Sequence, residues 1–190
     1  MIESLYEPFQ KWGEKGAVFC IADTHFDEDE DLRIVFPDRP SSEEMVKIIN
    51  RTCGKASTIL FLGDIGNPEW IKKIRGYKVM LTGNHDVGKT IYKEVFDEVY
   101  GHELIISDKI ILSHVPLSID WKFNIHGHTH TLTKDRLCHK CVCSDVIDYI
   151  PLNLNQFIKS GRLTEIKPIV RTTIDKATER KQKRGPWKHD

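Results

Sequence analysis

Three histidines occupy alternate positions in the segment IHGHTHT, residues 125–131: His126, His128 and His130. Imidazole nitrogen is the commonest protein ligand for transition metals, so the spacing is compatible with a metal site. Alternation alone is also typical of an ordinary half-exposed strand with one polar face. The rest of the chain has to decide between these two interpretations.

Polar residues end an apolar run at several other places in the chain. The runs are AVFCIAD, TILFLGD, YKVMLTGNHD and KIILSH, and FNIHGHTH contains the histidines above. The residues at or just beyond these four ends are Asp23, His25, Asp64, Asn84, His85, Asp86 and His114. Carboxylate, amide and imidazole donors without cysteine suit a divalent metal such as Mn, Fe, Zn or Ni. One ion would not use so many ligands. The set instead indicates two ions about 3.5–4 Å apart, with one carboxylate bridging them.

The apolar runs predict the elements that position these residues. They are rich in Val, Ile, Leu and Phe and too short for helices, so we expect buried strands. Helices are predicted between them: at 41–53, where Ser41 and Glu44 form a capping box, at 67–74 behind Pro68, and at 89–100. In open α/β sheets ligands bind beyond the carboxyl ends of the strands, where every residue named above lies.

The second half of the chain contains strands joined by short turns rather than by helices. Together with the alternating first half, this pattern predicts an α/β fold in which two sheets pack face to face with helices outside.

The five blocks resemble, in order, the signature of the calcineurin-like metallophosphoesterases. They are Asp23-x-His25, Gly63-Asp64, Gly83-Asn84-His85-Asp86, His114 and Gly127-His128-x-His130. The likeness spans roughly residues 17–154 and is closest to a small bacterial or phage-type branch without a cap domain. It implies a four-layer α/β/β/α sandwich and hydrolysis of phosphomono- or phosphodiesters through attack by a metal-bridged hydroxide.

The resemblance also implies a role for each site residue. Asp23, His25 and His130 would hold one metal, Asn84, His114 and His128 the other, and Asp64 would bridge them. His85 would protonate or stabilise the leaving group, with Asp86 orienting it. The cofactors would be two divalent ions, with Mn as first choice, and the substrate a small phosphoester or nucleotide. His126 is left with a structural or supporting role.

Two other functions stay open at this point. The first alternative is a non-catalytic scaffold that uses the same fold for protein binding, although every inferred ligand and His85 are present. The second is nucleic-acid binding through the basic end of the chain, where residues 159–190 hold ten Lys/Arg against four Asp/Glu. Nucleic acid is possible as a partner but is not favoured.

Composition limits the class of protein. The chain has 190 residues and no net charge, which predicts one domain, 1–158, followed by a basic C-terminal extension, 159–190. No apolar run is long enough to span a membrane and no secretion signal is visible, so we expect a cytoplasmic protein. The five cysteines are then expected to be reduced thiols, and CHKCVC lacks the second ligand pair of a zinc knuckle.

The loop after His25 is strongly acidic, with Asp or Glu at every position from 27 to 31. We expect it to be a solvated surface loop. If it faced the site instead, it would repel highly anionic substrates, and Arg33, Arg39 or Lys89 would have to supply the compensating contact to phosphate.

The composition of the C-terminal segment generates a first prediction. Ending the chain at Ala177 should leave its melting temperature and its turnover of small phosphoesters almost unchanged, because the removed residues are polar and lack an apolar pattern. Thermal unfolding and steady-state kinetics of the truncated and full chains provide the comparison. A large loss of either quantity would mean that this segment packs against the domain or reaches the site.

Overall fold

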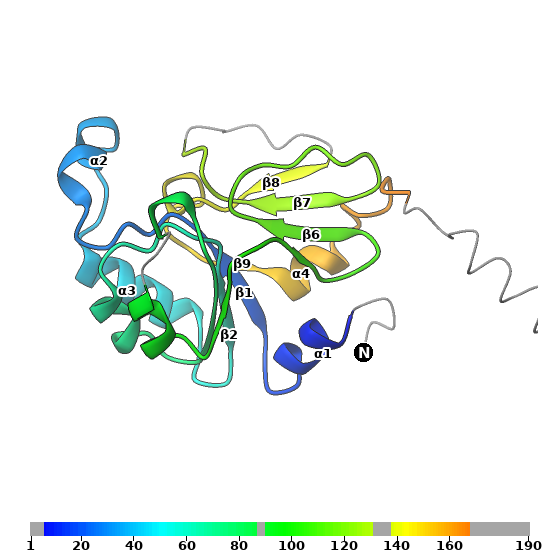
Figure 1. The fold of residues 1–190 in the computed structure, drawn as a ribbon, viewed down its shortest axis with the longest axis horizontal. Helices are drawn as coiled ribbons and strands as arrows, with labels where there is room; N and C mark the ends of the chain where they lie inside the picture. The colour runs from blue at the N-terminus through cyan, green and yellow to red at the C-terminus, as the bar shows by residue number, and fades with distance from the viewer. Residues whose placement is uncertain (1–5, 87–89, 131–137, 168–190) are drawn as a thin grey trace, which may run out of the picture.

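The computed structural model describes residues 6–86, 90–130 and 138–167. Two β-sheets form the centre of the molecule, one with five strands and one with four (Figure 1). Their strand orders are β4-β3-β2-β1-β9 and β5-β6-β7-β8. The predicted α/β class with two sheets is therefore confirmed.

The five-stranded sheet comes mainly from the first half of the chain. Its strands are β1 (Val18–Ile21), β2 (Thr58–Phe61), β3 (Tyr77–Leu81), β4 (Glu98–Tyr100) and β9 (Leu152–Asn153). Strands β1 to β4 pair in parallel, and β9 runs antiparallel to β1. The first three strands are the predicted apolar runs, and their carboxyl ends share one edge of the sheet.

The four-stranded sheet comes from the second half. It contains β5 (Leu104–Ile105), β6 (Ile110–Ser113), β7 (Phe123–His126) and β8 (His139–Cys141). Strands β6, β7 and β8 are parallel, and only β5 and β6 form an antiparallel pair. Because β6 and β7 are parallel, His114 and the histidines that follow β7 emerge at the same edge.

Helices and 3₁₀ turns lie between the strands. The α-helices are α1 (Glu7–Gly13), α2 (Asp29–Val35), α3 (Ser42–Thr52) and α4 (Leu154–Lys159). The 3₁₀ helices are η1 (Pro68–Lys73), η2 (Asn84–Asp86), η3 (Thr90–Glu94) and η4 (Ser144–Val146). Helix α3 matches its prediction, including the capping box in which Ser41 and Glu44 exchange hydrogen bonds.

The helix predicted at 89–100 is wrong as a single element. The structure has the short η3, then a turn, then β4, which pairs with β3 through Val79 and Glu98. Val99 therefore belongs to a strand rather than to a helical stripe with Ile91. Pairing with a neighbouring strand satisfies the backbone of this β-branched segment and outweighs its weak helical periodicity.

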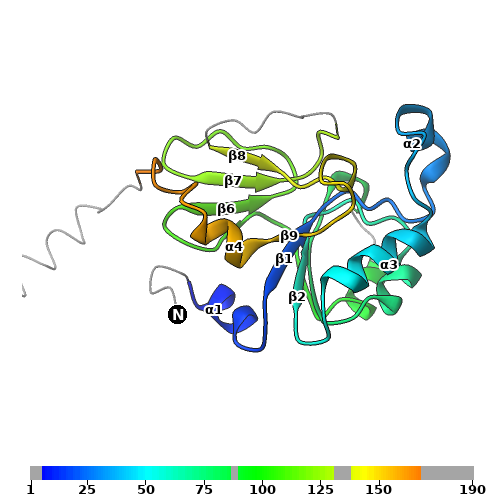
Figure 2. The same cartoon turned by 180° about the vertical axis from the view of Figure 1, so that it is seen from behind.

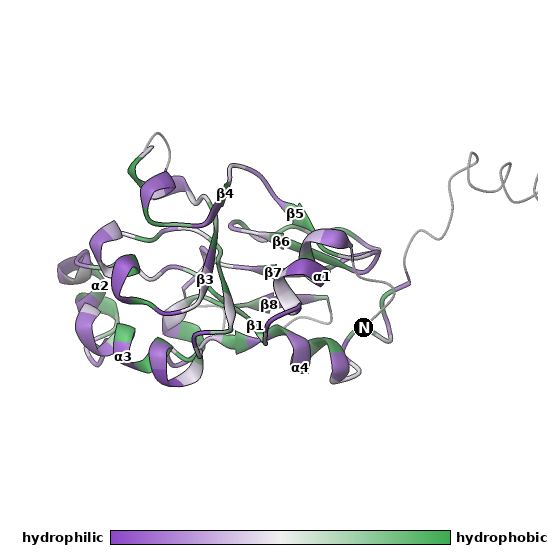
Figure 3. Cartoon of the chain, turned by 90° about the horizontal axis from the view of Figure 1, so that it is seen from below, coloured by the Kyte–Doolittle hydropathy of each residue, from purple (hydrophilic) through white to green (hydrophobic). Residues whose placement is uncertain are grey.

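Two apolar clusters hold the layers together. One lies between the sheets and includes Leu60 and Val79 from the first and Leu112 and Ile125 from the second. The other lies on the outer face of the five-stranded sheet, where Met45 and further residues of α3 pack. Figure 2 shows α3 beside β2 on that face, and Figure 3 shows β5 and β6 as apolar strands next to more polar helices.

The four-layer order that the resemblance implies is not confirmed. Helix α4 contacts β1 and β9, and its Phe157 ring lies 5.1 Å from the ring of Phe123 on β7. Among the described residues, every helix is too short or too polar to cross a lipid bilayer. The division at residue 158 stays a prediction, and Ile166, beyond that point, is buried in the cluster between the sheets.

Candidate metal centre

Two groups of potential metal ligands meet where the carboxyl ends of the strands converge. Asp23, His25 and His130 form one group, and Asp64, His114 and His128 form the other. Within each group the ligand atoms all lie within 4.8 Å of one another. Six of the seven predicted ligands are thus brought together in two sets of three.

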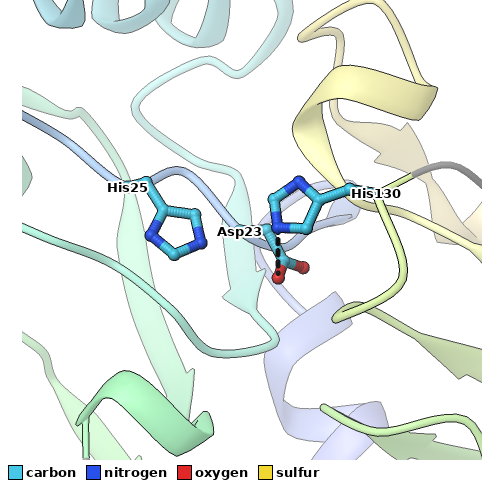
Figure 4. A group of neighbouring side chains, drawn as sticks. All are labelled: Asp23, His25 and His130. Atoms are coloured by element: carbon cyan, nitrogen blue, oxygen red, sulfur yellow. Dashed lines mark ion pairs between the residues drawn. The ribbon is translucent and has the colours of Figure 1, made fainter. Parts of the chain in front are cut away.

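The first group is assembled from the end of β1 and the loop after β7. Asp23 Oδ1 lies 3.5 Å from His130 Nε2, and the rings of His25 and His130 have centroids 5.4 Å apart. In Figure 4 the three side chains point toward one another. This is the arrangement expected of three ligands to one ion.

The second group includes the seventh predicted ligand, Asn84. Its Oδ1 lies 2.9 Å from His114 Nε2 and 3.0 Å from His128 Nδ1. These residues follow β3, β6 and β7, so both sheets contribute. The amide oxygen of Asn84 therefore adds an uncharged potential ligand beside His114 and His128.

Asp64 lies between the groups. Its Oδ2 is 3.8 Å from His25 Nε2, which belongs to the first group, and 3.3 Å from His114 Nε2, which belongs to the second. Burial raises the pKa of this carboxyl, but the hydrogen bond to His114 and the amide of His85 outweigh burial and hold the pKa below its usual value. Asp64 is therefore an ionised carboxylate that lies near a histidine of each group.

Asp23 provides an independent test of whether a cation fits. It is fully buried, and among the described residues its Oδ1 has no hydrogen-bond partner. Burial raises the pKa of this carboxyl above its ordinary value. A buried oxygen left without a partner is costly, and a divalent cation beside it would compensate both the lost hydrogen bond and the buried charge.

Hydrogen bonds on the far side of the rings orient the histidines. His25 Nδ1 contacts Glu28 Oε2 at 2.8 Å, His114 Nδ1 contacts the carbonyl of Leu62 at 2.8 Å, and His130 Nδ1 contacts Asp145 Oδ2 at 2.9 Å. Each contact assigns the proton to Nδ1 and leaves Nε2 for the metal.

The sequence analysis missed Glu28 and Asp145 as supporting residues. Glu28 lies three positions after His25, a spacing that could have indicated the contact. Asp145 lies fifteen positions after His130 and carried no local signal.

Arg39 corrects a sequence expectation. It was considered as a phosphate contact, but it is only 2% exposed and forms a buried ion pair with Asp145. Tyr149 also donates to Asp145, at 2.8 Å. These partners fix the carboxylate that contacts His130, so Arg39 supports the site from the interior and is not available as a surface contact to phosphate.

The backbone at the site is strained. Positive φ angles are uncommon for residues other than glycine, and they tend to gather at functional sites. Five of the seven predicted ligands have them: Asp23 at 56°, His25 at 40°, Asp64 at 53°, His128 at 72° and His130 at 43°. The fold holds the ligands in conformations that their own backbones disfavour.

Two motif glycines are required by close approach to the ligands. A Cβ atom on Gly83 would lie 2.2 Å from Asp64 Oδ1, and one on Gly127 would lie 2.3 Å from Asp23 Oδ2. Both distances are shorter than any non-bonded contact. These positions therefore serve the two buried carboxylates rather than chain flexibility.

Asp86 contacts the backbone instead of the His85 ring that it was expected to orient. It is 1% exposed, and its oxygens accept from the amides of Asp64 at 2.7 Å, Gly83 at 2.9 Å and Ile65 at 3.2 Å. It thus ties the loop after β3 to the loop after β2. His85 is exposed, and its amide donates to Asp64 Oδ1 at 2.9 Å.

His126, the third histidine of the segment at 125–131, and the five cysteines belong to neither ligand group. His126 is 1% exposed, with its ring 5.7 Å from that of His139, which agrees with a structural role. Cys143 Sγ accepts from the His130 amide at 3.4 Å. All five cysteines are free, and the ligand groups found in the described residues contain none of them.

A cleft of about 590 Å³ opens onto the two groups. Its lining residues are His25, Asp27, Glu28, Glu30, Asp31, Leu32, Asp64, His85, His128 and His130. The expectation of a merely solvated acidic loop is therefore wrong, because four of its carboxylates line the cleft. Of the cations proposed to compensate, Arg33 is absent from this lining, and Lys89 lies outside the described residues.

Comparisons with known proteins identify a similar fold but no family. No family model matches the chain, and no curated protein matches it. The structure resembles a protein of unknown function, AQ665, from Aquifex aeolicus, with a TM-score of 0.63 and 24% identity over 75% of this chain and 98% of that one. It has a weaker likeness to the nuclease MPE of Pseudomonas putida, with a TM-score of 0.46 and 18% identity over 60% and 61% of the two chains. The first likeness shows a shared fold.

The position of Asp64 between the groups predicts how metal binding responds to substitution. We expect two ions per chain, and Asp64→Asn should weaken both because it removes charge from both sites. Asp23→Asn should weaken mainly one. Elemental analysis and calorimetric metal titration measure these effects. A single tight ion in the wild type, insensitive to Asp64→Asn, would contradict the two-site interpretation.

The Glu28 contact predicts a selective effect on the first group. Glu28→Ala removes the partner of His25 Nδ1 and should weaken one of the two ions by about tenfold, the lower end of what supporting hydrogen bonds contribute. The other ion should bind unchanged. Glu43→Ala, which removes an exposed carboxylate on α3, is the matched control. Equal effects of the two substitutions on metal titration would rule out an orienting role for Glu28.

Proposed function

We propose that this chain is a binuclear metal-dependent phosphoesterase of the calcineurin-like type, with the four-layer sandwich of that family. The observation that carries the proposal is the position of the Asp64 carboxylate, within 4 Å of a histidine from each ligand group. Two groups of potential ligands with an ionised carboxylate near both form the kind of donor set that paired divalent ions require.

The residues divide between the two ions as the resemblance implies. Asp23, His25 and His130 would hold one, Asn84, His114 and His128 the other, and Asp64 both. The donors are oxygen and nitrogen, which suits Mn first, with Fe, Zn and Ni as alternatives. Bound there, the pair would supply Lewis acidity toward a phosphoryl oxygen and an activated water near neutral pH.

His85 would act on the leaving group in this proposal. Its ring lines the cleft and meets the ring of His25 edge-on, with centroids 5.5 Å apart. Its backbone amide is held by Asp64, so the side chain is anchored beside the proposed bridge while it remains exposed to the cleft. From there a ring nitrogen can donate a proton to the departing oxygen.

The same features favour catalysis over the alternative of a non-catalytic scaffold. A protein-binding scaffold needs neither an open cleft above the ligand groups nor an exposed histidine beside them. The basic segment behind the nucleic-acid alternative falls largely outside the described residues, so that alternative rests on composition alone.

The direct test is reconstitution. Metal-free chain should be inactive, and addition of Mn²⁺, Fe²⁺, Zn²⁺ or Ni²⁺ should restore hydrolysis of phosphomonoesters or phosphodiesters in proportion to the second equivalent of metal. A screen that also includes cyclic nucleotides covers both ester classes. A chain that holds two ions and hydrolyses none of these substrates would support the scaffold instead.

The role of His85 generates a separate prediction. His85→Ala should keep both ions, hydrolyse nitrophenyl esters with a modest defect, and fail on alkyl or nucleoside esters, because proton donation is worth about 10²- to 10⁴-fold and matters most for poor leaving groups. The measurement is the ratio of mutant to wild-type turnover across leaving groups of rising pKa.

His102→Ala, which removes an exposed histidine outside the lining of the cleft, is the control for this series. A flat ratio in His85→Ala with intact metal content would mean that another group donates the proton.

A further inference from the structure

One wall of the cleft is acidic. We call Asp27, Glu28, Glu30 and Asp31 the acidic wall; they come from the end of the loop after β1 and from the start of α2. The described residues that line the cleft include these four carboxylates and neither Lys nor Arg. A site that accepts phosphate would ordinarily be lined by cations.

Two members of the wall are held in place. Asp27 Oδ2 accepts from Asn67 Nδ2 and from Trp70 Nε1, both at 2.7 Å. Glu28 is held by His25 Nδ1. Two of the four carboxylates of the acidic wall are therefore fixed at the cleft by hydrogen bonds.

Two of the three cations that were expected to contact phosphate lie in the described part of the chain, and neither lines the cleft. Arg39 is buried in its pair with Asp145. Arg33, although exposed on α2, does not line the cleft. Among the described residues, this leaves the candidate metal centre as the source of attraction for phosphate. The buried Asp23 Oδ1, which accepts no hydrogen bond from them, independently indicates a cation there.

The metal centre and the acidic wall act differently on the first negative charge of a substrate and on any further negative charge. The first negative charge at phosphorus meets the two ions, whereas any further charge is repelled by the wall, since a cleft lined by one sign of charge focuses its field. A phosphomonoester has a second pKa of about 6 and is mostly a dianion at neutral pH. A diester bears one charge, and its second substituent is an uncharged group that can contact Leu32 in the same lining.

We propose that the acidic wall makes this site selective for phosphodiesters, with one negative charge at the reacting phosphorus, over phosphomonoesters and nucleoside polyphosphates. The inference rests on the proposed phosphoesterase function and specifies its substrate class. Glu30 and Asp31 are the residues that test it, because no hydrogen bond or ion pair found in the described part of the chain joins them to a proposed metal ligand, whereas Glu28 contacts His25.

The experiment compares methyl p-nitrophenyl phosphate with p-nitrophenyl phosphate, which share a leaving group and differ in charge. The two esters differ in intrinsic reactivity, so the decisive quantity is the change in their kcat/KM ratio between variants. Glu30→Gln/Asp31→Asn should shift the ratio toward the monoester by about three- to tenfold through loss of repulsion, with diester kcat/KM within about twofold. Glu43→Gln on α3 is the control and should shift nothing.

A second measurement does not depend on the variants folding. Raising the salt concentration from about 0.01 to 1 M shortens the Debye length from about 30 to 3 Å, so the wild-type ratio should move in the same direction. An unchanged ratio in both measurements, with both esters still hydrolysed, would overturn the selectivity and leave the phosphoesterase function standing. Failure to hydrolyse either ester with two ions bound would instead overturn the function itself.

Discussion

The structure depends on two carboxylates buried at the junction of two sheets. Asp23 and Asp64 are 0% and 2% exposed, and charged groups are expensive to bury without compensation. Part of the compensation comes from backbone amides: that of His128 donates to Asp23, and that of His85 donates to Asp64. Asp23 thereby holds the loop that carries His128, and Asp64 holds the loop that carries His85.

This mutual support explains why the loops tolerate strained backbone. The loops after β1, β2 and β7 all place ligands at positive φ, and Asp86 and the close approaches at Gly83 and Gly127 leave them little room to relax. The site is over-determined by contacts among its own loops. Ligands that are already held in place lose little conformational entropy when a cation binds, because that entropy is lost when the chain folds.

Charge is distributed in layers around the centre. Directly behind the ligands, Asp145 is neutralised by Arg39, so the support of His130 adds little net charge to the interior. In front, the acidic wall remains open to the cleft. The acidic wall and the candidate metal ligands thus line the same cleft, so a charged ligand that enters it meets the field of both.

Much of the fold and of the ligand set could be predicted because these features are local in the sequence. Short apolar runs that end in Asp, Asn or His specify both a buried strand and the polar group beyond it, and parallel strands then place those groups at one edge. Strands β1, β2, β3, β6 and β7 and helix α3 follow from this logic, as does the gathering of the polar side chains beyond those strands. Which of those side chains would bind metal was implied by the resemblance.

What only the tertiary structure decided involves partners distant in the chain. Strand β4 forms by pairing with the edge of β3. Arg39 is buried together with its partner Asp145, which is 106 positions away in the chain. Asp86 accepts hydrogen bonds from backbone amides of another loop. The acidic loop likewise lines the cleft together with His85 and His128, which come from distant parts of the chain. Hydrophobic pattern and residue type specify an element and its chemistry, but the partner of a buried charge depends on which loops the packed sheets bring together.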